Sequence, residues 1–267
     1  MRRHTTPAAA NGFTLIELLV VMMLLIILSV GTVRFLNDAS SGYLSGTQRG
    51  ELAADLRHVA HHIGITLREA TPNSLRVSAG GTCLELLPVA SASVYLSAPL
   101  GYADTTMRVV PFDNAPTPAT WRVALAPSAS LYNLTSPGAI SPTAMASAPD
   151  TDNIVTLSFA AAHQFAAASP RQRFFAVTQP VSYCLDNDSL YRYTNYGYQA
   201  TQPDPTILPT TLPDRSLLAS GLQPGSALFA LTPASLTRNA SVAITLTLNK
   251  GDDQLSLTHA VHVRNQT

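Results

Sequence analysis

Hydrophobic and polar residues follow three different patterns along this 267-residue chain, and the first is an almost unbroken apolar run. The run covers residues 13–33 and contains a single charge, Glu17. As a helix it would be about 30 Å long, which is the thickness of the hydrocarbon core of a bilayer. Because Arg2 and Arg3 precede the run, we expect a membrane-spanning helix whose N-terminus stays in the cytoplasm.

Two other interpretations of the apolar run fit the sequence less well. A core helix of a globular domain is one, but such a helix seldom has every face apolar. A cleaved secretory signal peptide is the other, and its apolar region would span about 7–15 residues and end in small residues at a cleavage site. The observed run is longer, residues 29–31 (SVG) fit such a site poorly, and Glu17 interrupts it.

The second pattern has a helical period and follows the apolar run. Apolar residues recur at spacings of three and four, which predicts an amphipathic helix that packs on a sheet: Leu52, Leu56, Val59, Ile63 and Leu67. Pro72 is expected to end this helix, because proline disfavours helical geometry at the residue before it. Gly42, Gly46 and Gly50 in its first half mark a bend, a segment that loosens or close helix contacts, and the sequence does not separate these.

The third pattern, beyond residue 73, is typical of β-structure. Short runs bounded by Pro, Gly, Asn or Asp predict strands at 74–78, 82–87, 107–112, 154–159, 173–178 and 181–185. Two hairpins are expected, one joining 181–185 to 190–194 and one joining 242–248 to 255–263. Residues 113–150 and 199–214 are predicted to be long loops, with one strand near 121–125 in the first.

Composition narrows the function classes. The chain is 46% hydrophobic but only 12% charged, with 16 basic and 16 acidic residues. This balance excludes general disorder and offers no electrostatic surface for nucleic acid. We find no nucleophile with a base, no paired acid and base and no phosphate loop. The sequence therefore predicts no enzyme activity, no cofactor, no metal site and no small-molecule substrate.

The start of the apolar run carries a specific motif. Residues 12–17 read GFTLIE after a short polar and basic leader, and they resemble the N-terminal signature of type IV prepilins and type II secretion pseudopilins. The resemblance implies that a membrane-embedded prepilin peptidase cuts between Gly12 and Phe13 and methylates the new amine of Phe13. It also implies assembly with other minor and major pilins through the N-terminal helix.

Physical chemistry supplies reasons for two positions of this motif. Gly12 allows the backbone to enter a narrow protease cleft without a side-chain clash. Glu17 is a carboxylate in an apolar setting, which is costly unless it is paired. In a filament its partner would be the amine of Phe13 on a neighbouring subunit. The alternative is a glutamate that is merely solvated at the membrane surface.

Short patches in the β-region extend the resemblance beyond the leader. Short stretches are most similar to O-type minor pilins of MSHA (mannose-sensitive haemagglutinin) pilus systems, namely residues 83–89, 173–185, 190–197 and 261–265. They are less similar to J-type pseudopilins and W-type minor pilins. This similarity implies a minor subunit, at the filament tip or in the initiation complex. The alternatives are a minor pseudopilin of a type II secretion system and a membrane-tethered periplasmic binding module or adhesin.

Several other residues were considered as sites. Cys83 and Cys184 both lie in strand-like segments, and an oxidising periplasm would favour a disulfide over two buried thiols. The other candidates are structural by default: His58, His61 and His62 are expected to form a solvated helix face, and His259 is expected to be a core residue. Residues 186–188 are expected to form a turn rather than a calcium loop. Strand packing or a partner surface is expected for the tyrosines at 183, 191, 193, 196 and 198.

Together these patterns predict an α+β protein, in which a long N-terminal α-helix with a transmembrane half and an amphipathic half packs on an antiparallel β-sheet domain. We expect a bacterial inner-membrane protein with a single pass, a cytoplasmic N-terminus and a periplasmic C-terminal domain that later enters a pilus or pseudopilus. The expected boundaries are a leader at 1–12, a transmembrane or filament-core helix at 13–36, an amphipathic helix at 37–72 and a β-rich domain at 73–267.

Overall fold

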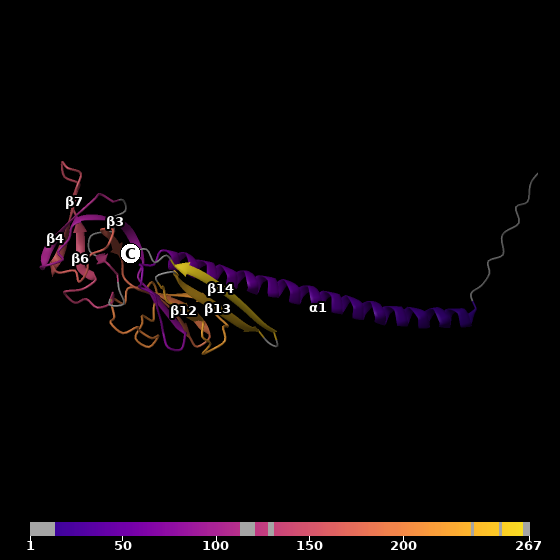
Figure 1. Cartoon of the computed structure of the whole chain (residues 1–267). Helices are drawn as coiled ribbons and strands as arrows, with labels where there is room; N and C mark the ends of the chain where they lie inside the picture. The colour runs from indigo at the N-terminus through magenta and orange to yellow at the C-terminus, as the bar shows by residue number, and fades with distance from the viewer. Residues whose placement is uncertain (1–13, 113–120, 128–130, 236–237, 251–252, 264–267) are drawn as a thin grey trace, which may run out of the picture. The chain divides into compact units, whose positions relative to one another are not determined.

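A computed structural model describes residues 14–112, 121–127, 131–235, 238–250 and 253–263. The chain divides into two compact units, Met1–Leu52 and Ala53–Thr267. One helix, α1 (Leu15–Arg68), runs through both units, and the strands all lie in the second. The described strands pair in antiparallel fashion, so the predicted α+β class is confirmed (Figure 1).

Three groups of strands make up the second unit. A five-stranded sheet has the order β1-β2-β9-β10-β11, a three-stranded sheet has the order β12-β13-β14, and a closed barrel has the order β3-β4-β7-β6-β5-β8. The strands of the two sheets are β1 (Arg76–Val77), β2 (Cys83–Leu86), β9 (Val181–Asp186), β10 (Ser189–Tyr193), β11 (Arg215–Ala219), β12 (Phe229–Thr232), β13 (Ala240–Lys250) and β14 (Asp253–Val263). The strands of the barrel are β3 (Val89–Ser97), β4 (Asp104–Val109), β5 (Arg122–Leu125), β6 (Ile140–Ala146), β7 (Val155–His163) and β8 (Arg173–Val177).

The two sheets are joined at a glycine. The backbone N–H of Phe229 donates to the carbonyl of Gly81 at 2.9 Å. Gly81 has a φ of +68°, and a Cβ there would lie 2.9 Å from the Cβ of Ala227. Only glycine tolerates both the left-handed backbone and this close approach, so the junction between the sheets depends on this residue.

The C-terminal part of α1 packs on these sheets through the predicted apolar stripe. Of the five predicted residues, Leu56, Val59, Ile63 and Leu67 are buried, and each contributes about 1.5–3 kcal/mol through burial, whereas Leu52 is half-buried. Tyr183 of β9 donates a hydrogen bond from its hydroxyl to Oγ1 of Thr66 at 3.0 Å. These contacts fix the last turns of the helix against the β-domain.

The helix ends at Arg68, four residues before the predicted stop at Pro72. The residues after it pair instead with the segment that leads into the barrel. The N–H of Thr71 donates to the carbonyl of Leu87 at 2.8 Å, and the N–H of Val89 donates to the carbonyl of Glu69 at 2.9 Å. Non-local backbone pairing therefore ends the helix earlier than local sequence predicts.

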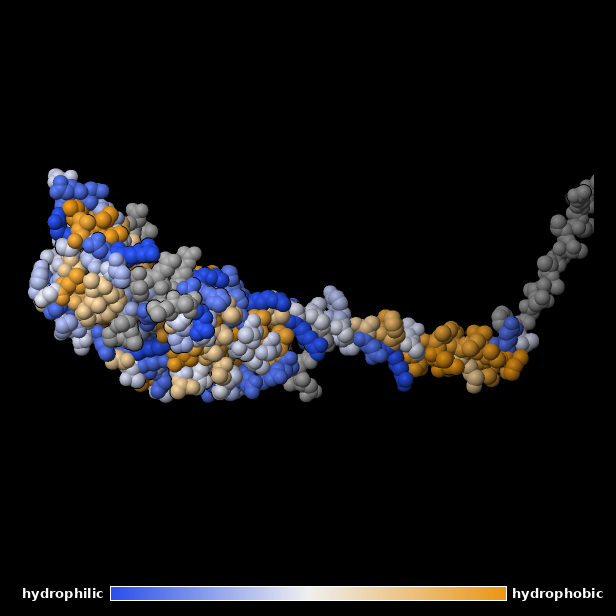
Figure 2. All heavy atoms as spheres, in the orientation of Figure 1, coloured by the Kyte–Doolittle hydropathy of each residue, from blue (hydrophilic) through white to orange (hydrophobic). Residues whose placement is uncertain are grey.

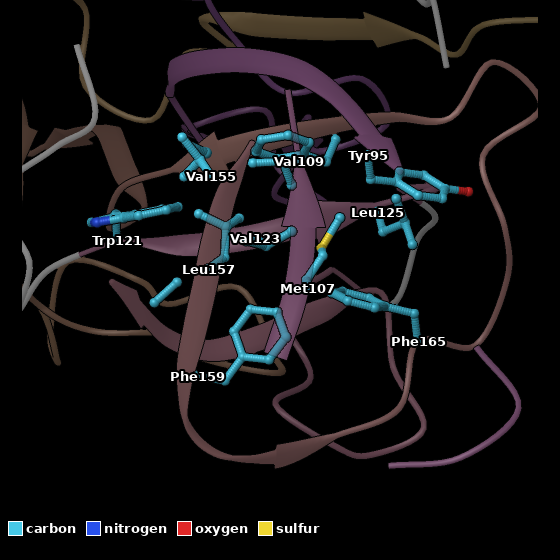
Figure 3. Packing of buried hydrophobic residues seen from close by; sticks show 13 residues of the cluster. Tyr95, Met107, Val109, Trp121, Val123, Leu125, Val155, Leu157, Phe159 and Phe165 are labelled. Atoms are coloured by element: carbon cyan, nitrogen blue, oxygen red, sulfur yellow. The ribbon is translucent and has the colours of Figure 1, made fainter. Parts of the chain in front are cut away.

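The barrel is an insertion between β2 and β9. These two strands pair directly with each other, while the 89–177 segment leaves and returns at one point, where Val89 pairs with Val177. Its interior holds its own hydrophobic cluster, which includes Trp121, Met107 and Phe159 (Figure 3). Phe112 packs against this cluster, and the rings of Trp121 and Phe174 both lie edge-on to it. A closed barrel has no exposed sheet edge, so the insertion is a complete structural module.

The expected long loop at 113–150 is wrong over part of its length. Residues 122–125 form β5, close to the one strand expected there, but β6 also lies in this region. The sequence of β6, ISPTAMA, has a proline and small residues that weaken its alternation, and its pairing partners β5 and β7 supply the order. Three further strands outside the loop, β3, β11 and β12, were also not expected.

The two cysteines form a disulfide. Cys83 and Cys184 are opposite each other on β2 and β9, with Cα atoms 4.1 Å apart and a separation of 101 positions in sequence. The bond therefore fastens the base of the inserted barrel, because it joins the two strands from which the barrel departs.

Replacing both cysteines by alanine is expected to lower the free energy of unfolding by about 2–4 kcal/mol, since the bond closes a long loop in the unfolded chain. Urea unfolding of the oxidised chain and of the double variant in a mild detergent measures this difference. Wild-type protein treated with a reductant is the matched control and should unfold at the same urea concentration as the double variant. Equal stability of oxidised and reduced protein would contradict the expectation.

Candidate functional site

The N-terminus of α1 is built by a capping residue. The backbone N–H of Glu17 donates to Oγ1 of Thr14 at 3.4 Å, so Thr14 satisfies one of the free amides of the first turn. Glu17 follows three residues later, which is the spacing of a capping box. Its negative charge also lies in the first turn, where the helix dipole favours it. The sequence contained this capping signal, and our prediction did not use it.

The first unit presents an apolar surface. Large side chains from Leu15 to Leu28 are 42–82% exposed, and the face of this segment that Figure 2 shows is predominantly hydrophobic. By length and composition α1 is able to cross a membrane, and none of its most apolar window is buried within the protein. Such a surface needs lipid or other helices to cover it.

Glu17 is exposed at the start of this surface. It forms no ion pair with any other residue that the structure describes. An unpaired carboxylate beside an apolar helix surface is able to form an ion pair with an ammonium group once water is excluded. Gly12 and Phe13, the predicted processing residues, lie outside the described residues.

Potential metal ligands stay apart in the part of the chain that the structure describes. Among the described residues, no group of three or more His, Cys, Asp and Glu side chains could hold a metal ion. His58, His61 and His62 lie exposed on α1. Burial lowers the pKa of His62, and the positive charges of Arg192 and then His58 lower it further.

The hairpin at 186–188 is a turn. Ser189 pairs with Asp186, and Asn187 has the positive φ that such a tight turn requires. Both carboxylates already have partners, because Asp186 accepts from Arg215 at 2.8 Å and Asp188 accepts from Ser189 at 2.8 Å. These contacts support the turn interpretation of this segment.

The tyrosines of this region are bound within the chain. Tyr183 bonds to Thr66, and Tyr191 lies against the guanidinium of Arg215 at 3.6 Å. Tyr193, Tyr196 and Tyr198 also pack against or bond to neighbouring side chains or backbone. These contacts indicate that the five tyrosines are packing residues.

A buried ion pair is the feature that sequence reasoning missed. Glu85 on β2 is fully buried and forms a salt bridge with Nε of Arg76, its cross-strand partner on β1. Tyr196 donates its hydroxyl to Oε1 of Glu85 at 2.9 Å. Arg76 also donates to the carbonyls of Gln199 at 2.7 Å and Ala200 at 2.9 Å. The network therefore ties the 196–200 segment to the sheet, close to the disulfide.

Burial dominates the electrostatics of Glu85. It raises the pKa of this carboxyl above the ordinary value, while the bond to Arg76, the charge of Arg76 and the bond to Tyr196 act in the opposite direction. The guanidinium lies 3.7 Å from the ring centroid of Tyr132, which adds a cation–π contact. The lone acid in the apolar run at 83–87 was the signal for this pair.

Comparison with known protein families finds a match at the N-terminal end of the chain. Residues 8–33 match the model of the prokaryotic N-terminal methylation motif. No curated protein and no solved structure matches the chain. The match covers the capped start of α1 and the apolar segment that follows it. Proteins with this motif are generally structural. The motif and the single apolar helix fit an inner-membrane anchor and support a type IV pilin-like or pseudopilin-like protein.

Proposed function

We propose that this chain is a minor pilin, a structural and assembly subunit of a type IV pilus of the MSHA kind. A prepilin peptidase would cut between Gly12 and Phe13 and methylate Phe13. The mature chain would wait in the inner membrane with its β-domain in the periplasm, and would then enter a filament with other pilins. The observation that carries the proposal is the methylation motif placed directly on a capped, exposed apolar helix.

The difference in burial between the two parts of α1 supports an assembly role. The part of α1 in the first unit leaves large apolar side chains uncovered, whereas the stripe from Leu56 to Leu67 is buried in the β-domain. The helix can therefore exchange lipid for neighbouring helices without disturbing the core of the β-domain. In the filament, Glu17 would pair with the amine of Phe13 on an adjacent subunit and offset the cost of burying both charges.

A second candidate function is favoured by the inserted barrel. The barrel has its own core, and both of its ends lie at one point of the sheet. It adds bulk that packing of α1 does not require, which suits a rare subunit at the filament tip, or a display role as an adhesin. A minor pseudopilin of a type II secretion system would use the same N-terminal chemistry, and the genetic background of the test below separates the two systems.

Mass spectrometry of the mature protein tests the proposal directly. We expect a chain that begins at Phe13 and carries one additional methyl group at its N-terminus. Cells that lack the prepilin peptidase are the control and should yield the chain with its leader attached. The variant Gly12→Val should also keep its leader, because its side chain obstructs the cleavage site. An unprocessed Met1 in wild-type cells, or cleavage beyond residue 33, would contradict the proposal.

Deletion strains assign the system. If the chain is a pilus subunit, sheared filaments from wild-type cells should contain it, and deletion of the MSHA-type assembly ATPase should remove it from that fraction. Dependence on the assembly ATPase of a type II secretion system instead would favour the pseudopilin alternative.

A further inference from the structure

The outermost strand of the three-stranded sheet has an unprotected edge. β14 pairs with β13 in eleven consecutive positions without a bulge, and it is the last strand in the order β12-β13-β14 (Figure 1). Residues 254–263 contain no proline, lysine, arginine or acidic residue. Proteins commonly protect exposed edges with such residues or with bulges, so this edge is open to pairing.

The hydrogen bonds of β13 show which backbone groups of β14 face outward. The N–H of Thr245 donates to Leu228 and the carbonyl of Thr247 accepts from Gln223, so these residues of β13 point away from β14. In an antiparallel pair, two directly opposite residues either bond to each other or both point their backbone groups away from the partner strand. The partners of Thr245 and Thr247 are Thr258 and Ser256, and the backbone groups of both therefore point to the free edge.

The direction of the backbone groups alternates in the same way along the whole of β14. The backbone N–H and carbonyl groups at positions 254, 256, 258, 260 and 262 all face outward, and none of them bonds to another residue within the described parts of the chain. An extended segment is the partner that satisfies such a row of donors and acceptors.

A groove beside the edge adds a chemical preference. It has a volume of about 450 Å³ and lies between α1 and β14, lined by Arg57, Ala60, His61, Leu257 and His259. Arg57 and His61 are exposed one turn apart on the same helix face, and no acidic residue lines the groove. Arg57 forms no ion pair with the described residues. The groove therefore fits an apolar side chain next to a carboxylate.

We propose that the edge of β14 is a strand-addition site for an extended, acidic segment of another protein. The segment would pair with the outward backbone groups between 254 and 262 and place a carboxylate against Arg57 and His61. The outer strands of a second copy do not supply that carboxylate, because residues 254–263 and the two outermost strands of the five-stranded sheet, β1 and β11, carry no acid. The site lies wholly within the second unit and does not depend on processing of the N-terminus.

Two synthetic peptides and three variants of the full chain in detergent micelles test the site. Valine alternates with glutamate in one fluorescent peptide and with lysine in the other, and fluorescence anisotropy measures their binding. We expect the glutamate peptide to bind at least about tenfold more tightly than the lysine peptide. Ala260→Pro should weaken its binding at least about tenfold, because it removes one outward N–H and no bond to β13.

Ala260→Val is the matched control, since it keeps the N–H and should bind within about twofold of wild type. Arg57→Gln should reduce the preference for glutamate over lysine. Circular dichroism and retention of the disulfide confirm that each variant is folded. Equal binding by the proline and valine variants would overturn the edge site, and equal binding of the two wild-type peptides would overturn its acidic preference. A wild-type dimer that Ala260→Pro dissociates, without peptide binding, would assign the edge to a second copy and overturn the proposed partner.

Discussion

Replacing Glu17 by alanine is expected to leave cleavage after Gly12 largely intact and to lower incorporation into filaments at least about tenfold. The carboxylate lies unpaired at the start of an apolar helix surface, where only an ammonium partner offsets its burial. Without it, the amine of Phe13 on the neighbouring subunit would be buried alone. The ratio of the chain in sheared filaments to the chain in membranes, measured by immunoblotting, gives the effect.

Two controls separate charge pairing from helix capping. Glu17→Gln keeps a side chain that can complete the capping box but removes the charge, so it should fail as alanine does. Thr14→Ala removes the hydroxyl that accepts the N–H of Glu17 and keeps the charge. It should cost about 1 kcal/mol of helix stability and still permit incorporation. Normal incorporation of Glu17→Gln into filaments would contradict the pairing account. So would a loss of incorporation that Thr14→Ala shows and the Glu17 variants do not.

The sequence was most informative where the signal is local. One charge in an apolar run located the methylation motif, which the family comparison supports for residues 8–33. The spacing of Leu56, Val59, Ile63 and Leu67 predicted the buried stripe of α1, because helical contacts repeat over a few residues. The same locality explains the hairpin of β13 and β14, whose apolar residues alternate along both strands.

The inserted barrel could not be predicted in this way, because its order is non-local. Its closure depends on pairing of β3 with β8, which are about 80 residues apart. Small residues also conceal the alternation that marks a strand, as in β3, where the sequence VASASVYLS alternates alanine with serine. The buried carboxyl of Glu85 was missed for a related reason, since its partner Arg76 becomes adjacent only when β1 and β2 pair.

Replacing Arg76 by alanine is expected to lower the free energy of unfolding by about 3–5 kcal/mol at pH 7, because it leaves a fully buried carboxylate without its cation. The variant also loses the bonds to the carbonyls of Gln199 and Ala200 and the contact with Tyr132. Urea unfolding of the full chain in a nonionic detergent, followed by circular dichroism, measures the loss.

The loss should depend on pH in a defined direction. Burial already raises the pKa of Glu85 above the ordinary value of 4.5, and removal of Arg76 takes away the strongest influence that lowers it. A group whose pKa is higher in the folded state binds its proton more tightly there. The stability of the variant therefore falls as pH rises from below 4.5 through the raised pKa. At about pH 4 the carboxyl is protonated in both states, and most of the electrostatic cost disappears.

A double variant isolates this electrostatic part. Arg76→Ala combined with Glu85→Gln has no buried charge, so it should recover much of the stability at pH 7 and lose the added pH dependence. The lost bonds to the carbonyls of Gln199 and Ala200 remain in both variants and do not vary with pH. Arg215→Ala is a surface control, because the side chain of its partner Asp186 is 35% exposed and water screens the charge left behind. If Arg76→Ala were equally destabilising at pH 4 and pH 7, the pair would act only through packing, and the assigned role of the buried carboxylate would be wrong.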